Sequence, residues 1–156
     1  MTRTADEWFD AYGHSHQNAL NKAIHWVCVP MITLTLVALL WSLPTGPLAS
    51  VAPWFNWSMI LIAIALVFYL RMSISIAIGM VVVVGAGIGL ILAWERFVDL
   101  PLWPAATVLF VLSWIAQFVG HKIEGEKPSF LEDIQFLLVG PAWLLHFIYR
   151  KVGIPY

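Results

Sequence analysis

Charged side chains are scarce in this chain of 156 residues. Asp, Glu, Lys and Arg together make up 11% of it, whereas an ordinary soluble domain has about 25%. Hydrophobic residues reach 61%, and the mean hydropathy is +0.85. This balance excludes an ordinary soluble domain and indicates an integral membrane protein, and the length predicts a single domain over residues 1–156.

An excess of basic residues and a pair of cysteines are also missing. The net charge of −1 argues against a nucleic-acid partner, which would require a basic surface. Cys28 is the single cysteine, so no internal disulfide can form. The first residues, MTRTADEWFDAYG, hold three acids and one arginine and do not resemble a cleavable signal peptide. We therefore expect the first apolar helix to act as its own insertion signal.

Long apolar runs predict the spans. Runs of about 17–25 residues are long enough to cross a bilayer as helices, and four are expected at about 23–43, 53–70, 74–94 and 104–120. A fifth apolar stretch at 134–150 contains Gly140-Pro141. Because proline interrupts helix hydrogen bonding, we expect a kinked or re-entrant helix pair there. The predicted fold class is an all-α integral membrane protein.

The distribution of Lys and Arg predicts the orientation. If residues 1–22 are cytoplasmic and the last stretch does not cross, every Lys and Arg except Arg96 lies inside, as the positive-inside rule requires. Tryptophans then gather at the outer interface: Trp41, Trp54, Trp57, Trp94 and Trp103. We expect a bacterial inner membrane, with the endoplasmic reticulum equally compatible.

The same orientation gathers all five histidines near the cytoplasmic face. His14, Asn18, Asn21 and His25 fall within about 60° of one another on a helix. Such a polar stripe has to face the bundle interior or a wet cavity. His16 lies off this stripe and can join it only if the residues before about Asn18 leave the regular helix.

Two later segments bring further histidines. His121 ends the fourth expected span after Gly120, which permits close approach of another backbone, and His146 follows Pro141. Converging imidazoles suit zinc, copper, iron or nickel. The predicted metal ligands are His16, His25, His121 and His146. The predicted catalytic or ligand-orienting groups are Asn18, Asn21 and Glu124. No H-E-x-x-H or C-x-x-C motif is present, so this prediction depends on convergence in space.

The glycine-rich segment at 79–92 predicts packing rather than nucleotide binding. Gly85 and Gly89 have the small-xxx-small spacing of close helix contacts. The segment lacks the G-x-G-x-x-G order and a preceding strand that a dinucleotide loop requires.

Two blocks of the sequence resemble one membrane family. The first is Tyr12 with His16-x-Asn18-x-x-Asn21-x-x-x-His25-x-x-x-x-Pro30. The second is Trp114-x-x-Gln117-Phe118-x-Gly120-His121, followed by Glu124, Pro128 and Gly140-Pro141. Together they are similar to the 2-hydroxy fatty acid dioxygenases of fungi and bacteria, from about Trp8 to Tyr149.

The resemblance implies an iron(II)-dependent α-oxidation. A long-chain 2-hydroxy fatty acid held at the membrane loses its carboxyl carbon to become a fatty acid one carbon shorter, and dioxygen is the oxidant. His16, His25 and His121 would be the iron ligands. The chain departs from the fungal pattern in two places: a glutamate is expected about one position after His146, and the segment at 121–128 is one residue shorter.

Other classes remain as alternatives. A non-enzymatic membrane protein that binds or transports a metal or small molecule would also place histidines and amides between spans, although no inverted repeat is evident. A membrane hydroxylase or desaturase would carry more histidines in H-x-x-H clusters. A purely structural protein predicts that the histidines can be replaced by alanine without effect.

Overall fold

The computed structural model describes residues 3–131 and 133–156. Over these residues the chain is helical and has no strand, which confirms the predicted all-α class. The elements are α1 (Ala5–His14), α2 (Ala19–Trp41), α3 (Leu48–Val51), α4 (Ser58–Met72), α5 (Ile74–Phe97), α6 (Leu102–Glu124), the 3₁₀ turn η1 (Ser129–Leu131) and α7 (Phe136–Val152).

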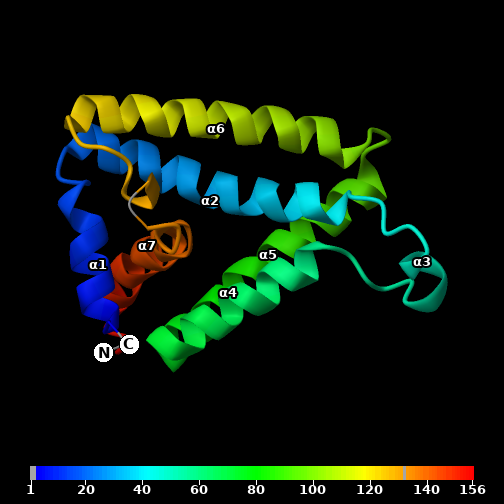
Figure 1. Ribbon diagram of the computed structural model, residues 1–156, viewed down its shortest axis with the longest axis horizontal. Helices are drawn as coiled ribbons and strands as arrows, with labels where there is room; N and C mark the ends of the chain where they lie inside the picture. Colours follow the sequence, from blue (N-terminus) through cyan, green and yellow to red (C-terminus); the bar gives the residue numbers. More distant parts are fainter. Residues whose placement is uncertain (1–2, 132) are drawn as a thin grey trace.

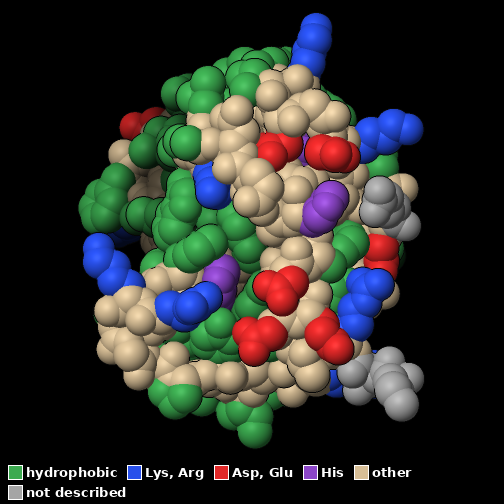
Figure 2. Space-filling model, turned by 90° about the vertical axis from the view of Figure 1, so that its left-hand side faces the viewer, with side chains coloured by type: hydrophobic (Ala, Val, Ile, Leu, Met, Phe, Trp, Pro, Cys, Tyr) green, Lys and Arg blue, Asp and Glu red, His purple; other side chains and the backbone are tan. Residues whose placement is uncertain are grey.

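The architecture consists of two long helix pairs and a third pair of helices packed at one end of the molecule. Helices α2 and α6 run antiparallel side by side, and α4 and α5 form a second antiparallel pair that crosses them (Figure 1). Helices α1 and α7 pack together at the end where α2 begins and α6 ends (Figure 1). Charged side chains gather on this end of the molecule (Figure 2).

In the described part of the chain, three helices are long and apolar enough to cross a membrane: α2, α5 and α6, of 23, 24 and 23 residues. They correspond to the first, third and fourth expected spans. The second expected span corresponds to α4, an apolar helix of 15 residues, which is shorter than the roughly 20 residues that a bilayer requires. Large apolar side chains such as Ile64, Val82 and Leu112 are 59%, 67% and 56% exposed. A surface of this kind matches lipid rather than water.

The chain breaks between α1 and α2. Asn18 caps α2, and its Oδ1 accepts hydrogen bonds from the backbone N–H groups of Leu20 (2.9 Å) and Asn21 (3.4 Å). Helix α1 ends at His14, and residues 15–18 are not helical. The regular helix is therefore interrupted before Asn18, which is the condition under which His16 can join the polar stripe of α2.

The C-terminal apolar stretch differs from the prediction. A pair of short helices was expected there, but α7 is one continuous helix with Pro141 inside it. Pro141 lies in the second turn, where it removes a single intrahelical hydrogen bond. A Cβ on Gly140 would lie 3.0 Å from the Tyr12 hydroxyl oxygen, so Gly140 allows α1 and α7 to approach closely.

The glycines of α5 also differ from the prediction. A Cβ added at Gly85 or Gly89 would meet nothing within 4 Å among the described residues. The predicted close packing of α5 against another helix of the chain at these two glycines is therefore wrong. The close approach occurs at Gly79 instead, where a Cβ would overlap the Tyr149 side chain of α7. The Tyr149 hydroxyl donates a hydrogen bond to the Ser75 carbonyl (2.9 Å), which ties α7 to the start of α5.

Candidate metal centre

Three histidines from distant parts of the chain meet at the α1–α7 end of the molecule. His16 lies in the α1–α2 connection, His25 in the second turn of α2 and His121 in the last turns of α6. Their ring centroids are 4.3 Å (His16–His25), 5.0 Å (His16–His121) and 5.0 Å (His25–His121) apart. One nitrogen from each ring lies within 4.8 Å of the other two. All three side chains are buried, and the cluster could hold a metal ion.

Hydrogen bonds fix the ring orientation of two of these histidines. Nδ1 of His16 lies 2.6 Å from the Tyr12 carbonyl oxygen, and Nδ1 of His25 lies 2.9 Å from the Asn21 carbonyl oxygen. A ring nitrogen at this distance from a carbonyl carries the proton and donates it, so Nε2 keeps a free lone pair. This is the arrangement that protein metal sites use to orient an imidazole ligand.

Burial keeps the His16 imidazole neutral. Removal from water, followed in size by the effect of the nearby His25, lowers the pKa of His16 to about 3. The ring also stacks on Tyr12, with centroids 4.2 Å apart. Because metals bind the neutral imidazole, His16 is held in the ligating form at physiological pH.

The three inward nitrogens have no protein partner. His16 Nε2, His25 Nε2 and His121 Nδ1 are buried without a hydrogen bond among the described residues. A buried polar atom left unpaired costs about 1–3 kcal/mol, and three at one place are rare in a folded protein. A divalent metal that accepts nitrogen ligands would satisfy all three, so the donor set fits such an ion.

Glu124 fastens the end of α6 to the start of α2. Its carboxylate accepts hydrogen bonds from the backbone N–H groups of Gln17 (2.7 Å) and Asn18 (2.9 Å), and from Nδ2 of Asn21 (3.0 Å). A carboxylate is favoured at a helix N-terminus because it complements the helix dipole and its free N–H groups. The predicted catalytic residues Glu124, Asn18 and Asn21 are therefore linked to one another, and the Asn21 carbonyl in turn accepts a hydrogen bond from the His25 ring.

Replacement of Glu124 tests this connection. We expect Glu124→Gln to lower the free energy of unfolding by about 1–2 kcal/mol, because an amide cannot accept all of these bonds and carries no charge. Thermal unfolding in detergent would measure the loss. Glu126→Gln, an exposed glutamate two residues later, is the matched control and should leave stability unchanged. Equal stability of the two variants would contradict the role of Glu124.

His146 and His14 lie outside the three-histidine cluster. His146 stacks on Phe9 (4.7 Å between centroids), and its Nδ1 faces the Trp143 carbonyl. It lines a hollow of about 250 Å³ together with His16, Lys22 and Arg150. His14 is exposed at the end of α1.

Tyr12 and Gln117 were not among the predicted site residues. Tyr12 precedes His16 by four positions, supplies its carbonyl to that ring and stacks on it. Gln117 precedes His121 by four positions and is 7% exposed. An amide one turn before a histidine within an apolar span was the signal for Gln117, because polar groups at this depth are costly.

These features define a class: a helical membrane protein in which two antiparallel helices and the connection before the first of them enclose a buried three-histidine centre. Residues 2–152 match the family model described as 2-hydroxy-palmitic acid dioxygenase Mpo1-like, and the chain belongs to this family. No curated protein and no solved structure matches the chain.

Proposed function

We propose that the protein is an iron(II)-dependent dioxygenase that shortens long-chain 2-hydroxy fatty acids by one carbon. The observation that carries the proposal is the set of three unpaired buried nitrogens on His16, His25 and His121 in a chain of this family. Three neutral nitrogen ligands leave coordination positions open, as non-haem iron oxygenases require. When bound, iron would supply the redox chemistry and the activation of dioxygen.

The overall reaction balances without an added reductant. A 2-hydroxy acid and one dioxygen molecule give the acid one carbon shorter, carbon dioxide and water. The bond between C1 and C2 breaks, C2 becomes the new carboxyl carbon, and the four electrons released reduce one dioxygen. The only co-substrate that the site has to admit besides the acid is therefore dioxygen.

The protein residues orient the ligands and exclude water. Tyr12 and Asn21 hold the His16 and His25 rings through their carbonyl oxygens, and the 5% or lower exposure of all three rings keeps bulk water out. The centre lies at the α1–α7 end of the molecule, where charged side chains gather on the surface (Figure 2) and where we place the lipid headgroups and the cytoplasm. A fatty acid in the bilayer has its carboxylate at the same level.

Product analysis tests the function. Purified protein loaded with iron(II) in detergent would receive 2-hydroxyhexadecanoic acid under air, and mass spectrometry would follow pentadecanoic acid. We expect the shorter acid to form with consumption of one dioxygen per product. Bound iron without product would leave a metal-binding or transport protein as the better explanation, and a protein that binds no iron would contradict the proposal.

A further inference from the structure

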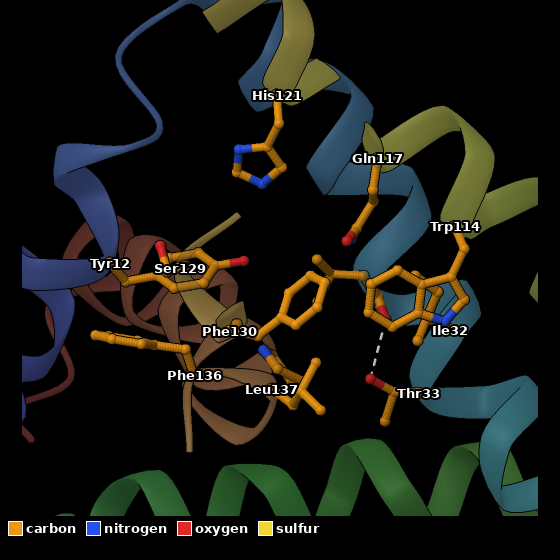
Figure 3. A pocket seen from close by; sticks show the side chains of 13 residues that line it. Tyr12, Ile32, Thr33, Trp114, Gln117, His121, Ser129, Phe130, Phe136 and Leu137 are labelled. Atoms are coloured by element: carbon orange, nitrogen blue, oxygen red, sulfur yellow. Dashed lines mark hydrogen bonds between the residues drawn. The ribbon is translucent and has the colours of Figure 1, made fainter. Parts of the chain in front are cut away.

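A small cavity adjoins the three-histidine centre on one side. It lies between α2, α6, η1 and α7, has a volume of about 40 Å³, and includes His121 among its lining residues (Figure 3). A water molecule needs about 10–15 Å³ of such volume, so the cavity has room for a few non-hydrogen atoms. A hydroxyl group or a short piece of an acyl chain next to the centre can therefore be accommodated here.

The cavity wall is apolar and uncharged. Its aromatic and aliphatic part consists of Val29, Ile32, Trp114, Phe130, Phe136, Leu137 and Pro141. None of the described residues that line it carries a full charge. Leu137 also lines the cavity and is 40% exposed, so a chain that begins in the cavity can continue outward past this side chain toward lipid. These walls suit hydrocarbon rather than a second carboxylate.

Four polar side chains besides His121 line this apolar cavity: Tyr12, Thr33, Gln117 and Ser129. Thr33 donates to the Val29 carbonyl (2.9 Å), and Ser129 pairs with Ser15 (2.6 Å), so both hydroxyls are satisfied. The Gln117 amide and the Tyr12 hydroxyl, by contrast, have no hydrogen bond among the residues drawn in Figure 3. The Gln117 side chain points into the cavity between His121 and Trp114 (Figure 3).

An amide inside an apolar span is unfavourable unless a hydrogen-bonding partner such as a ligand or a water molecule reaches it. Gln117 offers a donor and an acceptor together, and Tyr12 adds a hydroxyl. A hydroxyl group on an acyl chain is the complementary partner, because it too donates and accepts. Its attachment to the carbon next to the carboxylate would put it beside His121.

We propose that Gln117, assisted by the Tyr12 hydroxyl, recognises the 2-hydroxyl group of the acid, and that the apolar cavity holds the adjoining chain carbons. This inference rests on the proposed function and names the group that distinguishes a 2-hydroxy acid from an ordinary fatty acid. Gln117 is thus a specificity-determining residue that touches substrate.

Equilibrium binding tests the inference without turnover. Iron-loaded protein in detergent, kept free of oxygen, would be titrated with 2-hydroxyhexadecanoic and hexadecanoic acid by calorimetry. We expect Gln117→Leu to keep its iron and to lose about tenfold of the preference for the hydroxylated acid, the factor contributed by one hydrogen bond. Tyr12→Phe, which retains the carbonyl and ring that hold His16, should reduce the preference in the same direction.

Gln135→Leu is the matched control, since Gln135 is exposed before α7, and it should keep the wild-type preference. An unchanged preference in Gln117→Leu, with iron bound, overturns this inference and leaves the proposed function standing. Wild-type protein that binds iron but neither acid overturns both. The iron content of each sample separates these outcomes.

Discussion

Alanine at His25 or His121 is expected to abolish iron binding. Each variant removes one of three inward nitrogens, and the two that remain cannot enclose an ion in the same way. Since loss of even a supporting residue commonly weakens metal affinity about 10–100-fold, loss of a ligand should exceed about 100-fold. Metal analysis after purification would show iron falling from about one ion per chain to a small fraction of that.

Thermal unfolding gives a second measure of the same change. A bound ion stabilises the folded state by mass action, so iron should raise the melting temperature of the wild type and leave both alanine variants unmoved. His14→Ala is the matched control, because His14 is exposed two residues before His16 and lies outside the cluster. Equal iron in His14→Ala, His25→Ala and His121→Ala would disprove the three-histidine centre.

Gly120→Ala is expected to damage both the fold and the centre. A Cβ at this position would overlap Oδ1 of Asn21 and would lie 3.5 Å from Cδ1 of Ile24. Asn21 cannot move away freely, because its amide also bonds to Glu124 (3.0 Å) and its carbonyl holds His25. We expect a loss of about 1–3 kcal/mol in the free energy of unfolding, the usual result of overpacking. Iron affinity should fall about tenfold or more as His25 and His121 are displaced.

Gly89→Ala is the control for this substitution. Gly89 lies inside α5, where an added Cβ meets no described atom within 4 Å. Alanine there should leave iron binding unchanged and raise stability by about 0.5–1 kcal/mol, because glycine is the poorer helix former. Thermal unfolding and metal analysis of the two variants side by side would decide. Similar behaviour of Gly120→Ala and Gly89→Ala would show that α2 and α6 are not in close contact at the site.

Composition and pattern were sufficient to predict the helical membrane class and most helix positions. Apolar runs specify spans because a bilayer penalises charge along a whole helix. The predicted convergence of His25 with His121 is observed, and the position of His16 depended on the break that Asn18 creates. Spacing alone could not show this break, because a capping residue is recognised by where its side chain bonds rather than by sequence period.

The remaining differences come from contacts between helices. The proline predicts an interruption because it removes one helix hydrogen bond, but α7 continues through Pro141. The close-packing role of Gly79 rather than Gly85 or Gly89 depends on which face of α5 meets Tyr149. The expected ligand His146 lies outside the cluster, because its ring packs on Phe9 and Phe147 instead. Sequence spacing contains none of this information.

The wide separation of the histidines along the chain has a consequence for biogenesis. Two of them lie within the first 25 residues printed, but the third comes only at residue 121, after α2, α4 and α5 have been synthesised. A nascent chain therefore has no complete three-histidine cluster until α6 lies beside α2. Under the proposed function, iron loading becomes a late maturation step, and an unassembled chain would not expose a redox-active ion to the cell.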